Sequence, residues 1–115
     1  MTLQKKKLGQ KGEKQAKKLL QNKGYKFITA NYHTRYGEID LIFQDEGQLV
    51  FVEVKTRSSN ILGNPEEAIT KEKINHLRKA AHIFLNSNPK LPQFARFDAV
   101  SILGSKADHF VNISQ

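Results

Sequence analysis

The sequence predicts a small α/β or α+β domain in which helices flank a mixed β-sheet of four to five strands. Two segments, residues 8–22 and 64–86, carry apolar residues at helical spacing. Three strand-like segments lie between them, and one or two follow the second helix. The second helix can therefore form the crossover between two parallel strands. A length of 115 residues fits one domain, which we expect to span residues 1–115.

The first helix is expected at residues 8–22. Its apolar residues share one face, and lysines occupy the others: Leu8, Ala16, Leu19 and Leu20. Gly24 follows closely and is typical of a helix end. Gly9 and Gly12 lower the helix propensity of the first turns, so the start of the helix is left open.

Four strands are expected, at residues 25–32, 38–44, 48–56 and 96–103, and a short fifth at residues 110–113 is left open. The first is rich in aromatic and β-branched residues. Asp45, Glu46 and Gly47 separate the second strand from the third and are typical of a tight turn. These two strands should therefore form an antiparallel hairpin.

The second helix is expected to begin at Asn64 and Pro65, after a loop at residues 57–63. Asparagine is a favoured capping residue, and proline is favoured at the first helical position. An apolar stripe indicates the face that packs on the sheet: Ile74, Leu77, Ala81, Phe84 and Leu85.

The net charge of +8 is distributed very unevenly. Residues 1–26 hold nine lysines and one acid, whereas the rest of the chain holds ten basic and ten acidic residues. A segment of this kind suits nucleic acid or an anionic membrane, and it also suits a solvated helix face that only aids solubility.

The absence of cysteine excludes disulfides, thiolate metal ligands and a cysteine nucleophile. No apolar run approaches the roughly 20 residues that span a bilayer. The basic residues 1–7 are not followed by the apolar segment of a secretion signal. A cytoplasmic protein without a membrane partner is therefore expected.

Two charged residues interrupt the end of an almost wholly apolar strand. Residues 49–54 indicate a central strand that is covered on both faces. Because alternate residues share a face, Glu53 and Lys55 should emerge side by side.

The hairpin register brings a second carboxylate to this place. If Glu46 and Gly47 form the turn, Asp40 lies opposite Glu53, and Glu38 lies opposite Lys55. Apposed carboxylates are stabilised by a shared cation, and Mg²⁺ or Mn²⁺ suits oxygen ligands. The alternative is a structural ion pair in which Lys55 bridges Glu53 and Glu38.

The spacing from Asp40 to Glu53-Val54-Lys55 resembles the PD-(D/E)xK nuclease pattern, with Ile39 in place of its proline. Matching pieces over residues 9–102 resemble the YraN family, which is similar to archaeal Holliday-junction resolvases: Gly12-Glu13, residues 37–42, residues 50–57, Lys73 and residues 96–98. The resemblance implies a restriction-endonuclease-like core. It also implies that Asp40 and Glu53 are metal ligands, that Lys55 is catalytic, and that Glu13 reaches the same metal.

Nucleic-acid contacts are expected from basic residues around these acids: Lys11, Lys14, Lys18, Arg35, Arg57 and Lys73. The histidines are scattered and form no ligand pair. No aromatic stacking platform is evident in the sequence. Arg96 is expected to pair with Asp98 or another acid.

The function expected first is a Mg²⁺- or Mn²⁺-dependent endonuclease acting on DNA, with branched DNA as one substrate class. The alternative is a non-catalytic nucleic-acid-binding module with the same fold. A more distant alternative is a protein-interaction domain with a solubilising helix. Because a junction needs two symmetric cuts, a homodimer is an open option.

Overall fold

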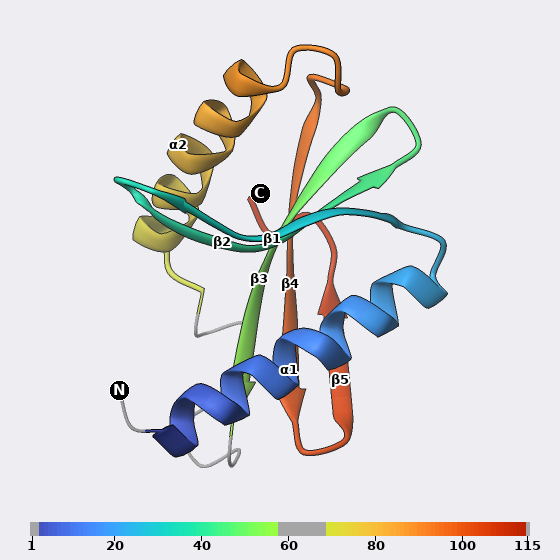
Figure 1. The fold of residues 1–115 in the computed structure, drawn as a ribbon, viewed down its shortest axis with the longest axis vertical. Coiled ribbons are helices and arrows are strands. Elements are labelled where there is room, and N and C mark those ends of the chain that lie inside the picture. The colour runs from blue at the N-terminus through green and yellow to red at the C-terminus, as the bar shows by residue number, and fades with distance from the viewer. Residues whose placement is uncertain (1–2, 58–68, 115) are drawn as a thin grey trace.

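The computed structural model describes residues 3–57 and 69–114, with backbone alone for residues 3–8. The elements follow the chain in this order: α1 (Leu3–Asn22), β1 (Lys26–Thr34), β2 (Gly37–Asp45), β3 (Gln48–Arg57), α2 (Lys71–Ser87), β4 (Ala95–Leu103) and β5 (Lys106–Phe110). The strands form one sheet in the order β1-β2-β3-β4-β5 (Figure 1). The fold class predicted from the sequence is confirmed.

The sheet is mixed because α2 links β3 to its parallel neighbour β4, as the sequence predicted. All other neighbouring strands are antiparallel. Asp45 pairs with Gln48 across the two-residue turn, and the same register continues to the pair of Leu41 and Val52. Glu46 takes a positive φ of 56° in this turn. The predicted hairpin register is thus confirmed from the turn to Leu41.

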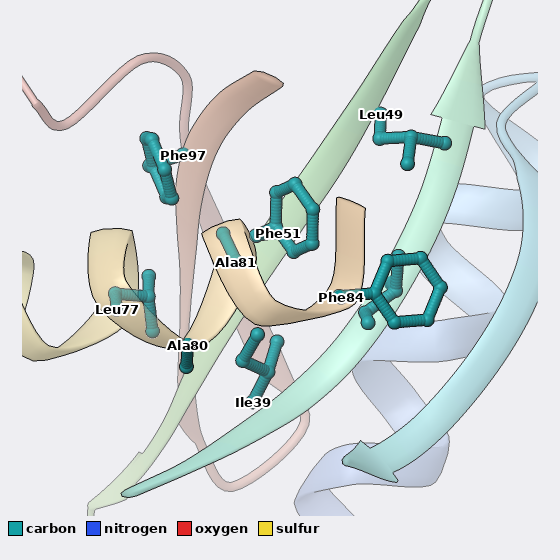
Figure 2. Packing of buried hydrophobic residues seen from close by; sticks show 9 residues of the cluster. Ile39, Leu49, Phe51, Leu77, Ala80, Ala81, Phe84 and Phe97 are labelled. Atoms are coloured by element: carbon teal, nitrogen blue, oxygen red, sulfur yellow. The ribbon is translucent and has the colours of Figure 1, made fainter. Parts of the chain in front are cut away.

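The two helices cover opposite faces of the sheet (Figure 1). On one face, α2 packs its apolar stripe against the sheet (Figure 2): Leu77, Ala80, Ala81 and Phe84 meet Ile39, Leu49, Phe51 and Phe97. On the other face, Ala16 and Leu20 of α1 pack against side chains of β2, β3 and β4. Within the described residues, neither helix is long and apolar enough to cross a membrane.

Helix α1 ends as the sequence predicted. Gly24 adopts a φ of 95°. Its N–H donates to the carbonyl of Gln21 at 3.0 Å, and the N–H of Tyr25 donates to the carbonyl of Leu20 at 3.1 Å. This pattern satisfies the last helical carbonyls and turns the chain into β1.

The predicted start of the second helix at Asn64 and Pro65 lies outside the described residues. Of the loop predicted at residues 57–63, only Arg57 is described, and it belongs to β3. In the described part of the chain, α2 begins at Lys71, and residues 69–70 are not helical. The predicted helix over residues 64–86 is therefore wrong at these two residues. Thr70 is extended (φ −86°, ψ 162°), and its hydroxyl accepts a hydrogen bond from the N–H of Lys73 at 3.2 Å. Thr70 is therefore the cap of this helix.

The fifth strand was also predicted in the wrong place. It occupies Lys106–Phe110 rather than residues 110–113. Gly104, with a φ of 60°, and Ser105 form a tight turn, so Leu103 pairs directly with Lys106. A two-residue turn brings the chain back at once, which leaves residues 111–113 beyond the strand.

A buried carboxylate, Asp98, stabilises the start of β4. Its side chain is fully buried and accepts two hydrogen bonds from Arg96, both at 3.0 Å. It also contacts the Nε2 of His109 at 2.8 Å and accepts from the N–H of Asn112 at 3.0 Å. These partners hold the pKa of Asp98 below its usual value, and the predicted pairing of Arg96 with Asp98 is confirmed.

Replacing Asp98 by alanine should lower the free energy of unfolding by about 3–5 kcal/mol, because it leaves the Arg96 guanidinium without its buried partner. Urea denaturation measures this loss. Asp108→Ala is the matched control. Asp108 on β5 is half-exposed, and its Oδ2 lies 4.0 Å from the Nζ of Lys106, so it forms only a surface ion pair. A loss at Asp98 no larger than at Asp108 would contradict the structural role of the network.

Candidate metal and catalytic site

The predicted site lies where β2 separates from β3. Regular pairing of the two strands ends at Leu41 and Val52. One residue further on, a carboxylate oxygen of Asp40 accepts a hydrogen bond from the backbone N–H of Val54 at 2.7 Å. The side chain thus satisfies a backbone donor of β3 beyond the end of the paired stretch, and it anchors Asp40 beside Glu53.

The separation follows from a change of face along β2. Leu41 packs on the α1 side of the sheet, whereas Ile39 packs on the α2 side. Alternate residues of a regular strand share a face, so β2 must rotate at Asp40. Opposite this point in β1, Asn31 has a φ of 53°, a conformation that asparagine tolerates better than most residues. The hairpin β1–β2 therefore turns toward α2 at Asp40 (Figure 1).

Helix α1 brings Glu13 to the same place. Gly12 is buried against β3, and a Cβ at this position would overlap the hydroxyl of Thr56. The missing side chain allows α1 to approach β3 closely, and Glu13 follows directly. One carboxylate oxygen each of Glu13, Glu38 and Asp40 lie within 4.8 Å of one another. Glu13 and Asp40 meet, as the resemblance implied.

The role of Glu38 was not foreseen from the sequence. A straight hairpin would have placed it opposite Lys55, but the rotation of β2 directs it to Glu13 and Asp40. In the amide orientation that satisfies both of its polar atoms, Asn31 donates to Glu38 Oε1 at 2.6 Å and to Glu13 Oε1 at 2.9 Å. The available signal was the Glu38-Ile39-Asp40 spacing, which puts two acids on one side of a strand. Nothing in the pattern indicated Asn31.

The carboxyl groups of this site are poorly compensated in charge. Burial, followed by the charges of Asp40 and Glu38, raises the pKa of Glu13 to about 7. Burial, followed by the charge of Asp40, raises the pKa of Glu53 to about 7. Burial also raises the pKa of Asp40 to about 6, although the hydrogen bond from Val54 opposes this shift. A cation bound among these groups would favour their ionised forms.

Two lysines lie on the β3 and α2 sides of the carboxylates. Lys73 and Lys55 both lower the pKa of Asp40 and of Glu53, with Lys73 exerting the larger effect. Among the described residues, Lys55 forms no ion pair within 4.0 Å. Lys55 is therefore not locked into the structural ion pair that was the alternative interpretation of this strand.

The other predicted contact residues lie on several elements. Lys11, Lys14 and Lys18 are exposed, and they lie on the side of α1 opposite to the buried Ala16. Arg35 is exposed in the turn between β1 and β2. Arg57 is the half-buried last residue of β3. These basic residues thus lie on different elements of the described chain, and Lys73 on α2 lowers the pKa values of Asp40 and Glu53.

The donor set fits a hard divalent cation. Glu13, Glu38 and Asp40 offer clustered carboxylate oxygens, and Glu53 lies beside Asp40. Mg²⁺ and Mn²⁺ favour such oxygen ligands and retain coordination positions for water or phosphate. Thiolate ligands are excluded, because the chain contains no cysteine.

The stability of the metal-free protein should depend on pH in a defined direction. The folded state raises the pKa values of Glu13, Asp40 and Glu53 to about 7, 6 and 7, so it favours their protonated forms. This contribution is complete below about pH 4 and is lost as the pH rises through about 6–7. In EDTA, Tm should therefore fall between about pH 5 and about pH 8, and Mn²⁺ should raise Tm mainly at the higher pH.

Thermal denaturation with and without Mn²⁺ measures both effects. Glu53→Gln should weaken the pH dependence and the metal effect, whereas Asp108→Asn, outside the site, should leave both unchanged. An equal Tm shift by Mn²⁺ at both pH values would contradict competition between protons and metal at these carboxylates.

The sequence matches proteins of one family over nearly its whole length. A model described as "Uncharacterised protein family UPF0102" matches residues 12–102. A UPF0102 protein of Syntrophomonas wolfei is 49% identical over 109 residues, which cover 91% of this chain and 95% of the relative. Its counterpart in Desulforamulus reducens is 41% identical and covers 92% and 88%, respectively. The chain belongs to the UPF0102 family, which is the YraN family predicted from its motifs.

Proposed function

We propose that this protein is a Mg²⁺- or Mn²⁺-dependent endonuclease that hydrolyses phosphodiester bonds of DNA. The observation that carries the proposal is the cluster of Glu13, Glu38 and Asp40 oxygens within 4.8 Å, at the point where β2 leaves β3. Lys55 emerges from the same strand end as Glu53. Acidic oxygen ligands beside a lysine are what metal-assisted attack on a phosphodiester needs.

Each residue has a distinct task in this proposal. Asp40, which the Val54 N–H holds in place, would bind the metal together with Glu13, Glu38 and Glu53. A cation held by these residues would supply a water of lowered pKa and positive charge beside the phosphate oxygens. The Lys55 ammonium donates to a phosphate oxygen and offsets the negative charge that develops during attack.

DNA as the partner is supported by the charge distribution. Lys11, Lys14 and Lys18 form an exposed basic face on α1, the helix that also carries Glu13. Lysines of this kind contact phosphates without reading sequence. Arg35, Arg57 and Lys73 extend these contacts around the carboxylates. A DNA substrate is consistent with a cytoplasmic location.

The resemblance to archaeal resolvases favours branched DNA as the substrate. Two symmetric cuts across a junction require two active sites, so the proposal includes a homodimer as the form that acts on such substrates.

A second candidate function is DNA binding without cleavage. The exposed lysines of α1 lie on the side of the helix that faces away from the sheet, so they can contact phosphates without the carboxylate site. This module would bind DNA in a salt-dependent manner that is independent of divalent metal.

Cleavage of branched and linear DNA in Mg²⁺ and in Mn²⁺ tests the first proposal. Asp40→Asn, Glu53→Gln and Lys55→Met should each lower the rate by about 100-fold or more. The first two variants lose a carboxylate ligand of the proposed metal, and the third loses the ammonium that offsets charge on the reacting phosphate. Asp108→Asn is the matched control and should cut like wild type. Equal rates for wild type and Asp40→Asn in all four conditions would exclude the enzyme proposal.

Salt titration of DNA binding tests the basic face of α1. Replacing Lys14 and Lys18 together by glutamine should lower the slope of log K against log salt by about 2, because two phosphate contacts are lost. Lys90→Gln with Lys106→Gln is the control pair of exposed lysines outside this face. An unchanged slope would assign the phosphate contacts to other residues. Binding that persists in Asp40→Asn without any wild-type cleavage would favour the binding module.

A further inference from the structure

A pocket of about 140 Å³ opens beside the carboxylate site, between the β1–β2 turn and α2. Its walls combine apolar, aromatic and polar side chains: Tyr36, Glu53, Lys73, His76, Leu77 and Ala80. Leu77 and Ala80 belong to the buried core, whereas Lys73 and His76 are exposed on α2. The pocket therefore has an apolar base and a polar rim that includes two of the proposed metal ligands, Glu38 and Glu53.

The aromatic wall is held in place by the β1–β2 turn and by two cations. The hydroxyl of Thr34 accepts from the Tyr36 N–H at 3.1 Å and donates to the carbonyl of Gly37 at 2.8 Å. The guanidinium carbon of Arg35 lies 4.9 Å from the centre of the Tyr36 ring, and the ammonium of Lys79 lies 5.2 Å from it. The ring is thus fixed relative to both the turn and α2. The sequence showed no aromatic platform because Tyr36 and His76 are forty positions apart and meet only through the fold.

We propose that this pocket binds an unpaired nucleobase of the DNA substrate, next to the phosphate that is cut. The volume of about 140 Å³ lies well below the roughly 300 Å³ of pockets for drug-sized ligands, so it suits one ring system rather than a whole nucleotide. Tyr36 and His76 contribute aromatic rings to the lining, and Leu77 and Ala80 contribute apolar side chains. Proteins hold unpaired bases with side chains of these kinds.

The charges at the rim favour a base over a free anion inside the pocket. The carboxylates of Glu38 and Glu53 both contribute to its wall and would repel a phosphate that entered without a metal. Lys73, also on the rim, can instead contact the phosphate attached to a bound base. The base would thereby place its own phosphate near Glu53 and the proposed metal.

This inference rests on the proposed nuclease function and specifies its substrate class. A base inside a duplex must be unpaired and unstacked before it can enter a pocket, whereas a base in a bulge, a flap or a junction point is already accessible. DNA with an unpaired nucleotide at the cleavage position should therefore bind more tightly than fully paired DNA of the same sequence.

Binding in EDTA tests the pocket without any cleavage. The probes are a paired duplex and the same duplex with one bulged 2-aminopurine, whose fluorescence changes when it stacks. Wild type should prefer the bulged duplex by about fivefold to a hundredfold, the range expected for one base stacked on a protein ring. Tyr36→Leu and His76→Ala should reduce this ratio toward one and abolish the fluorescence change. Tyr36→Phe, which keeps the ring, should retain both.

His82→Ala is the matched control, because His82 is exposed on the same helix but does not line the pocket. Equal affinity of wild type for the two duplexes would overturn the inference. A preference that survives both Tyr36→Leu and His76→Ala would overturn it as well. Cleavage of paired DNA that depends on Asp40 would still support the nuclease in either case, so failure of the pocket and failure of the enzyme are distinguishable.

Discussion

The hydrogen bond from the Val54 N–H to the Asp40 carboxylate is the interaction on which the arrangement of this site depends. At 2.7 Å, it holds β2 to β3 beyond the last regular pair of the two strands. Beyond this bond the β1–β2 hairpin is free to turn toward α2. That turn brings Glu38 beside Glu13 and forms the outer wall of the neighbouring pocket. The same bond favours the ionised form of Asp40, which is the form that a metal needs.

The buried Asp98 and the half-buried acids of the candidate site differ in how the fold compensates their charge. Asp98 is surrounded by donors from Arg96, His109 and the Asn112 backbone, and its pKa is lowered. At Glu13, Asp40 and Glu53 burial outweighs the stabilising contacts, and the pKa values of these groups are raised to about 6 or 7. Asp98 is compensated from within the fold and needs no ligand. In the second group, protons or an added cation would supply this compensation. Carboxyl groups with perturbed pKa values are concentrated at functional sites.

Sequence patterns predicted most of the fold because each pattern had a local physical cause. Helical spacing, the glycine that ends α1 and the tight turn after Asp45 act over a few residues, and all of them reappear in the structure. The register predicted for the β2–β3 hairpin correctly brought Asp40 close to Glu53, because the observed pairing follows that register as far as Leu41. It failed for Glu38 because the rotation of β2 depends on packing against both helices. Such packing is a property of the whole molecule rather than of one segment.

The position of Glu13 also could not be predicted from local sequence patterns. A single acid in a lysine-rich helix has no periodic signal of function, and only the family resemblance suggested its role. The structure supplies the physical reason, because the buried Gly12 lets α1 lie directly on Thr56. A glycine inside a helix lowers helix stability by about 1 kcal/mol relative to alanine. Gly12 thus lowers the stability of α1 directly beside Glu13, an acid with a raised pKa. Such a loss is typical of a functional site, where the position of a helix matters more than its own stability. The carboxylate cluster and the glycine beside it are therefore parts of one arrangement, in which local stability is given up where the cation is proposed to bind.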